Sequence, residues 1–188
     1  VSNIAIPEAV LAQADQGGML KQLGYSSLSF DLSSEGTSTI SDTALDYAFN
    51  FTVAGKDIAA IKFGLGANAI PLSVFDEMQT AQTQGRQPDF SKLMPELQNV
   101  EVTGATLRFE DASITKKVLP MIAAMQGMDE KTLVASVGPM MQMGLMQLQN
   151  EAFAKQAMDS VTAFLNEPKS LTVTAKPAAA LKVSDFMS

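Results

Sequence analysis

Leu45-Asp-Tyr-Ala-Phe-Asn-Phe-Thr-Val53 has the clearest periodicity in the chain. Apolar side chains alternate with polar or small ones, so every second residue points to the same side of an extended backbone. This pattern is typical of an antiparallel strand with one buried face. Gly55-Lys-Asp57 then forms the turn of a hairpin. The return strand has Lys62 outward and three apolar side chains inward, Ile61, Phe63 and Leu65.

Three further runs with a period of two extend this sheet. Leu28, Phe30 and Leu32 alternate with polar residues before the hairpin, and 171–175 does so near the end of the chain. In the run 99–110 the apolar positions change phase at Gly104, where a β-bulge would restore their facing. We therefore expect strands at all three places.

Helical periodicity begins at Ser113. An apolar stripe from Ile114 to Met125 predicts one helix, and Gly127 ends it. Asp129 caps a second helix, which Gly138-Pro139 bends or splits, and Asn150 caps a third, which ends before Pro168. Shorter helices are expected over 7–23, with a break at Gly17-Gly18, and over 72–82.

Strands grouped apart from helices predict an α+β fold. The expected architecture is an antiparallel, curved sheet of about five strands, with one face covered by about three Met-rich helices. Residues 1–188 form a single domain, which we expect to be one module of a longer exported protein. The stretch Leu72–Met78 resembles Leu181–Met187, which fits a linker type used twice, a further module, or chance.

Composition excludes several kinds of function. The chain has no Cys and no His, which removes thiol nucleophiles, imidazole bases and the usual zinc sites. Its net charge of −7 repels phosphate backbones, so nucleic acid is not an expected partner. Only 18% of the residues are charged, which fits an exported bacterial protein. We expect neither enzymatic activity nor a cofactor or metal, and no transmembrane segment.

Methionine is concentrated in the helical half. Eight of the twelve Met residues lie between 121 and 158, and residues 132–150 carry no charge. One interpretation is a core helix that is buried most of the way round, with Met filling gaps in the layer that covers the sheet. The other is an adaptable apolar surface for a lipid or another amphipathic ligand. The candidate ligand-binding residues are Met121, Met125, Met140, Met141, Leu145 and Phe153.

Other motifs have simpler interpretations. Gly64-Leu-Gly66 lacks the third glycine of a dinucleotide loop. Ser113 lies close to Lys116-Lys117, as a Ser/Lys dyad requires, but a solvated helix turn explains the same residues. Glu110-Asp111 and Asp129-Glu130 stand next to helix starts, where carboxylates cap the helix and favour its dipole.

Several segments together resemble a known group of proteins. Leu23-Gly-Tyr25 leads into alternating strands, Leu107-Arg-Phe-Glu-Asp-Ala-Ser113 joins a strand to a helix, and Ala163-Phe-Leu-Asn-Glu-Pro168 precedes Leu171-Thr-Val-Thr-Ala-Lys-Pro177. Over 20–187 the chain is similar to uncharacterised exported or envelope proteins of Gram-negative bacteria. The resemblance implies an extracytoplasmic, periplasmic location and carries no site residues.

Two functions remain open. The first is a non-enzymatic domain that binds a hydrophobic or amphipathic ligand between sheet and helices. The second is a structural or protein-interaction module of a larger cell-envelope protein.

Overall fold

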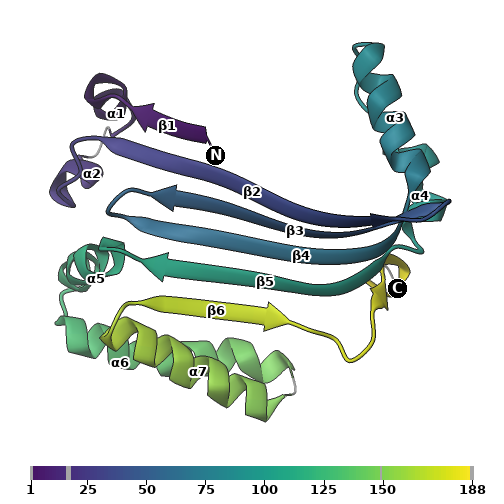
Figure 1. Ribbon diagram of the computed structural model, residues 1–188. Coiled ribbons are helices and arrows are strands. Elements are labelled where there is room, and N and C mark those ends of the chain that lie inside the picture. The colour runs from purple at the N-terminus through teal and green to yellow at the C-terminus, as the bar shows by residue number, and fades with distance from the viewer. Residues whose placement is uncertain (1, 16–17, 149, 187–188) are drawn as a thin grey trace. The chain divides into compact units, whose positions relative to one another are not determined.

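A computed structural model shows a protein with helices and a seven-stranded antiparallel sheet (Figure 1). It describes residues 2–15, 18–148 and 150–186. The strands lie in the order β1-β2-β3-β4-β5-β6, and β7 pairs with β5. They are β1 (Ser2–Ile6), β2 (Leu28–Ile40), β3 (Ala44–Gly55), β4 (Ala59–Pro71), β5 (Glu101–Asp111), β6 (Ser170–Ala175) and β7 (Leu181–Lys182). Because spatial order follows chain order as far as β6, each of these strands lies beside its sequence neighbour.

Five of these strands were predicted, and β1 and β7 were missed, so the expected number of about five was too low. The sequence of β1, Ser-Asn-Ile-Ala-Ile, has no clean alternation, and only its antiparallel pairing with Leu28–Leu32 makes it a strand. Strand β7 is two residues long and pairs with Glu101 and Val102. Such short pairings depend on a distant partner, which local periodicity does not reveal.

The chain divides into two compact units, and the strands β2 to β6 contribute residues to both. Unit 1 comprises Val1–Leu32, Val53–Ile61 and Arg108–Thr172. Unit 2 comprises Ser33–Thr52, Lys62–Leu107 and Val173–Ser188.

In unit 2, β3 has the predicted alternation. The rings of Tyr47, Phe49 and Phe51 follow one another on one face, with centroids 6.2 and 6.3 Å apart. Gly36 on β2 makes room for the first ring, since a Cβ there would lie 2.5 Å from the Tyr47 hydroxyl oxygen. The aromatic ladder is therefore a property of the alternating sequence together with one glycine on the next strand.

The phase change predicted at Gly104 is also visible in unit 2. A Cβ at Gly64 would lie 3.8 Å from the Cβ of Thr106, and a Cβ at Gly66 would collide with the Thr103 hydroxyl. The two glycines are two residues apart on β4, whereas their threonine partners are three residues apart on β5. One extra residue on β5 between the threonines accounts for this, as a bulge at Gly104 does.

Unit 1 contains the three predicted helices α5 (Ile114–Met125), α6 (Glu130–Leu145) and α7 (Glu151–Asn166). The Asp129 carboxylate accepts a hydrogen bond from the Thr132 amide at 2.9 Å, and the Asn150 side chain accepts one from the Phe153 amide at 3.0 Å. Both predicted caps are confirmed. Helix α6 continues through Gly138-Pro139 instead of splitting there.

A small core joins these helices. Leu119 and Ala123 of α5 pack against Leu133 and Val134 of α6, and the half-buried side chains of Ile122, Met128 and Leu165 surround them. Helix α7 also reaches the sheet in this unit, because Phe164 contacts Phe109 of β5 edge to face, with centroids 5.7 Å apart.

The shorter helices are α1 (Glu8–Ala14), α2 (Met19–Gln22), α3 (Leu72–Thr83) and α4 (Met94–Leu97). Gly18 precedes α2 with φ +65°, and Gly17 of the predicted break lies outside the described residues. Helix α4 was not predicted. The resemblance between Leu72–Met78 and Leu181–Met187 is not structural: the first stretch is helical, whereas 181–186 forms β7 and a 3-10 turn, and Met187 lies outside the described residues.

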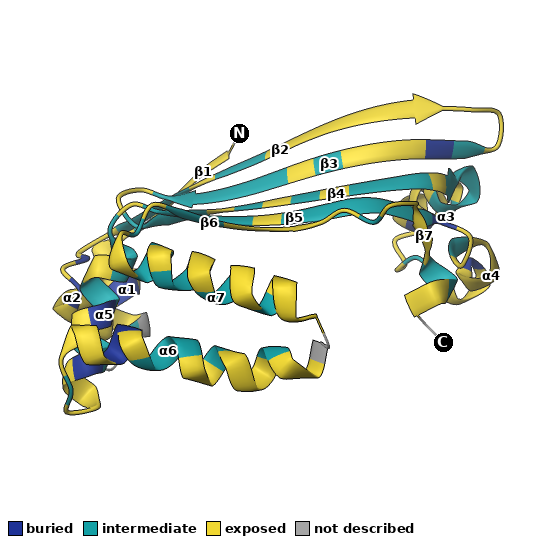
Figure 2. Ribbon diagram, turned by 90° about the horizontal axis from the view of Figure 1, so that it is seen from below, coloured by how far each residue is buried: buried dark blue, intermediate teal, exposed yellow. Residues whose placement is uncertain are grey.

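The predicted cover of one sheet face by Met-rich helices is wrong in two respects. The apolar side chains expected to point inward from β4 are exposed, by 49% at Ile61, 39% at Phe63 and 37% at Leu65. Helices α5, α6 and α7 instead bury parts of their apolar stripes against one another, and Figure 2 shows several of the buried residues, in dark blue, near the α5–α6 junction. Contact with the sheet within unit 1 is seen at Phe164 of α7, which meets Phe109 of β5.

Candidate functional site

The Met-rich part of α6 presents one exposed apolar edge. Met140, Met143 and Met146 are three residues apart, which places them on the same side of the helix and of the 3-10 turn that follows it. They are 71%, 75% and 70% exposed. Met141 and Leu145 lie on another side and are half-buried. The interpretation of this segment as a helix buried most of the way round is therefore wrong. We call Met140, Met143 and Met146 the Met edge.

A hollow of about 720 Å³ adjoins the Met edge at the end of the α6–α7 pair. Leu145, Met146, Ala154 and Met158 form its apolar part. Its polar residues are Gln142, Asn150, Glu151 and Lys155. The Lys155 ammonium forms a 2.7 Å ion pair with Asp159 one turn along α7. The volume lies in the range of small-molecule sites, and the mixture of an apolar lining and a few polar groups is what such sites have.

The six candidate residues do not gather into one site. Leu145 lines the hollow, and Met141 is half-buried beside it on α6. Met140 belongs to the exposed Met edge. Met121 is half-buried on α5, Met125 is 77% exposed near the end of that helix, and Phe153 is 43% exposed in the first turn of α7.

Sequence reasoning omitted Met146, Met158 and the polar residues of the hollow from its candidates. Met146 and Met158 belong to the same Met-rich segment, so composition already pointed to them. Their meeting requires the turn at Asn150, which brings the end of α6 beside the start of α7. The cap at Asn150 was the sequence signal for that turn.

Unit 2 has a second exposed apolar surface, on its strands. Gly64 approaches Asn50 and Thr106 on one face of the sheet, so Phe63, Leu65 and Leu107 point to the opposite face. Arg108 donates a hydrogen bond to the Thr172 hydroxyl, so these two side chains share the first face. Val173, the next residue, therefore points to the opposite face, with Leu107. We call this the apolar sheet face: Tyr47, Phe49, Phe63, Leu65, Leu107 and Val173.

The apolar sheet face has the extent of the largest apolar patch on a typical monomer. Of its residues only Phe49 is half-buried, and the other five are between 37% and 54% exposed. Together they expose on the order of 400 Å² of side chain, taking a large apolar side chain as roughly 200 Å². A patch of this size is often functional, so this face is a candidate interaction surface.

The serine and lysine singled out in the sequence do not form a dyad. Ser113 lies 2.9 Å from the Tyr25 hydroxyl and donates its own proton to the Asp57 carbonyl oxygen at 2.5 Å. The Lys117 ammonium lies over the Tyr25 ring, 3.7 Å from its centre. Because the serine proton is used by a backbone carbonyl and the lysine faces a ring, this network holds the β3–β4 turn to the start of α5.

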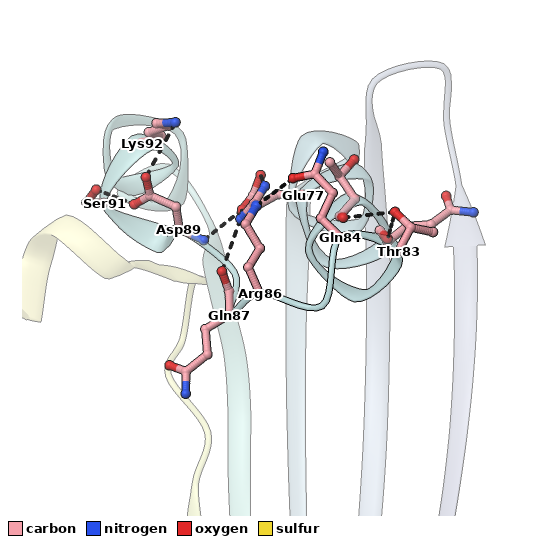
Figure 3. Close-up of polar contacts among 10 residues, drawn as sticks. Glu77, Thr83, Gln84, Arg86, Gln87, Asp89, Ser91 and Lys92 are labelled. Carbon is pink, nitrogen blue, oxygen red and sulfur yellow. Dashed lines mark hydrogen bonds and ion pairs between the residues drawn. The ribbon is translucent and has the colours of Figure 1, made fainter.

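A charged cluster in unit 2 has a similar structural role (Figure 3). Glu77 of α3 accepts hydrogen bonds from the Arg86 guanidinium, at 2.5 and 3.1 Å, and from the Asp89 amide at 2.7 Å. The hydrogen bonds from Arg86 and then Asp89 lower the pKa of Glu77 from 4.5 to about 2. Lys92 lies 3.5 Å from the Asp89 carboxylate. The cluster fastens the loop after α3 to that helix.

Within residues 2–15, 18–148 and 150–186, no group of three or more carboxylates is placed to hold a metal ion. No helix in the described part of the chain is both long and apolar enough to span a bilayer.

Comparison with known proteins gives a family but no activity. The chain belongs to the family whose model is described as "Uncharacterized protein" and matches residues 52–188. That range contains β4 to β7 and α3 to α7, and so both the Met edge and most of the apolar sheet face. Comparisons with curated proteins and with solved structures gave no match.

Proposed function

We propose that this protein is a non-enzymatic binding domain that takes a hydrophobic or amphipathic, lipid-like ligand at the end of the α6–α7 pair. The observation that carries the proposal is the hollow beside the Met edge. Its apolar lining from Leu145, Met146 and Met158 suits an acyl chain or another slender apolar group. Met side chains adapt to irregular apolar ligands because the thioether is flexible and polarisable.

The polar residues of the hollow favour an amphipathic ligand over a purely apolar one. Gln142 and Asn150 offer amide donors and acceptors, and Glu151 and Lys155 supply one charge of each sign. A molecule with an apolar tail and a small polar head would meet both kinds of group. The site proposed here is the hollow between two helices, whereas the sequence suggested a site between sheet and helices.

We further propose that the domain acts outside the cytoplasm, in the periplasm of a Gram-negative bacterium. The support is the low content of charged residues and the resemblance to envelope proteins. An envelope location would bring the hollow near lipids and their single-chain products.

The experiment measures binding of lauric acid and of a fluorescent naphthylamine dye by the whole chain. Wild type should bind both, and Met146→Gln with Met158→Gln should weaken binding by about tenfold or more. Gln is matched to Met in length and replaces the apolar thioether with an amide. Met125→Gln is the control, since that side chain is about as exposed as Met146 but lies outside the hollow. Absence of binding by folded wild type would refute the proposal.

The apolar sheet face favours a second function, that of a protein-interaction module. Its occupant would be an apolar protein surface such as an amphipathic helix, because a flat face of aromatic and aliphatic side chains offers no enclosed volume. Phe63→Glu with Leu107→Glu should abolish retention of an envelope protein that wild type retains. The Met146→Gln and Met158→Gln protein should retain it. Equal retention by all three proteins would exclude this face.

A further inference from the structure

We infer that the Met edge is a site of methionine oxidation, and that its conversion to sulfoxide by a peroxide or hypohalous acid switches off binding at the adjoining hollow. This regulation rests on the proposed function. The first argument for oxidation is the reactivity of the side chains. The chain contains no Cys and no Trp, so the thioethers of its Met residues are the side chains that oxidants attack first.

Accessibility selects particular thioethers. Met140, Met143 and Met146 are at least 70% exposed, whereas Met121, Met128, Met141 and Met158 are half-buried within the same helical segment. Oxidation of Met follows access of the oxidant to sulfur. The Met edge should therefore react well before its half-buried neighbours.

The three Met residues of the Met edge also lie next to one another. They lie on one side of the chain at successive intervals of three residues, and the surrounding segment 132–148 carries no charged side chain. Met146 belongs both to the Met edge and to the lining of the hollow. A chemical change along the edge thus alters one wall of the binding site directly.

The reaction balances with hydrogen peroxide as oxidant. The sulfur lone pair attacks one peroxide oxygen, an S–O bond forms as the O–O bond breaks, and the second oxygen leaves as water after proton transfer. Sulfur is oxidised by two electrons and peroxide is reduced by two. The product sulfoxide is polar and accepts hydrogen bonds, so three of them in a row turn an apolar edge into a hydrated one. An acyl chain then loses its apolar contact at Met146.

The test treats folded protein with hydrogen peroxide and follows each Met by peptide mass spectrometry, together with binding of the naphthylamine dye. Met140, Met143 and Met146 should oxidise at least about fivefold faster than Met121, Met128 and Met141, and dye affinity should fall about tenfold as they do. Met125, which is 77% exposed, should oxidise as fast.

Two variants separate the effect of the Met edge from general damage. Met140→Leu, Met143→Leu and Met146→Leu together should have the same dye affinity before and after peroxide treatment, whatever that affinity is relative to wild type. Met125→Leu should lose affinity on treatment as wild type does. Equal oxidation rates at exposed and half-buried Met residues would overturn the inference, as would full binding by protein oxidised at the Met edge. If untreated wild type binds no dye, the proposed function fails and the switch with it, whereas the oxidation rates still report the selectivity of the edge.

Discussion

Removal of the Tyr25 hydroxyl should cost more stability than removal of the only other tyrosine hydroxyl in the chain. Tyr25 is buried, and its hydroxyl lies 2.9 Å from Ser113 Oγ. Since the Ser113 proton is donated to the Asp57 carbonyl oxygen, the tyrosine must donate the bond between them. Tyr25→Phe removes this one neutral hydrogen bond, so we expect a loss of about 0.5–1.5 kcal/mol.

Ser113→Ala tests the same network from the other side. It leaves both the Tyr25 hydroxyl and the Asp57 carbonyl without this partner, and we expect a loss of about 1–3 kcal/mol. The double variant Tyr25→Phe with Ser113→Ala should then cost less than the sum of the single variants, because the two side chains share one bond.

Urea denaturation followed by far-ultraviolet circular dichroism measures these differences. Tyr47→Phe is the matched control, since that ring is 37% exposed on the apolar sheet face, and its loss should stay within about 0.5 kcal/mol. Equal losses for Tyr25→Phe and Tyr47→Phe, or strict additivity of the Tyr25 and Ser113 changes, would refute the reasoning.

Three further predictions concern packing, pH and strand pairing. Leu133→Ala in the helical core should lower the free energy of unfolding by about 2–5 kcal/mol, whereas Leu107→Ala on the apolar sheet face should lower it by less than about 1 kcal/mol. Equal urea midpoints for these two variants would show that Leu107 is not exposed. The lowered pKa of Glu77 stabilises the fold above about pH 4.5, and this stabilisation is lost as the pH falls towards 2. Glu77→Gln should flatten the pH dependence of the urea midpoint in that window, and Glu35→Gln should not. Strand β1 pairs only with Leu28–Leu32, and the Lys56 amide donates to the Ser29 carbonyl, so odd-numbered amides of β2 face β3. The amides of Ser34, Gly36 and Ser38 then point away from β3, beyond the end of β1. Their hydrogen exchange should be fast, and exchange at Thr37 should be slow.

Much of the secondary structure was predictable because its signals are local. The alternation in Leu45–Val53 and the stripe from Ile114 to Met125 each follow from the period of one element. The caps at Asp129 and Asn150 follow from side chains that bond to amides three residues on. The register shift at Gly104 was also predictable, because the apolar residues change from even to odd positions there.

The candidate site was only partly predictable. The Met-rich composition of 121–158 drew attention to the correct segment, but not to the correct set of side chains. Which Met residues are exposed depends on how α6 packs on α5 and α7. The periodicity of α6 does not distinguish a partner helix from a sheet, because either buries the same stripe.

The sequence by itself determined the α+β class, the strands β2 to β6, the two caps and the absence of thiol and imidazole groups. Composition and local periodicity fix these before any distant contact forms. Only the tertiary structure decided what each apolar face packs against. It paired the Met-rich helices with one another, left Phe63, Leu65 and Leu107 exposed on the sheet, and placed Met146 and Met158 at one hollow. The physical reason is that burial is a relation between segments far apart in the chain. Apolar periodicity records only that a face is apolar, and not whether, or by which partner, it is covered.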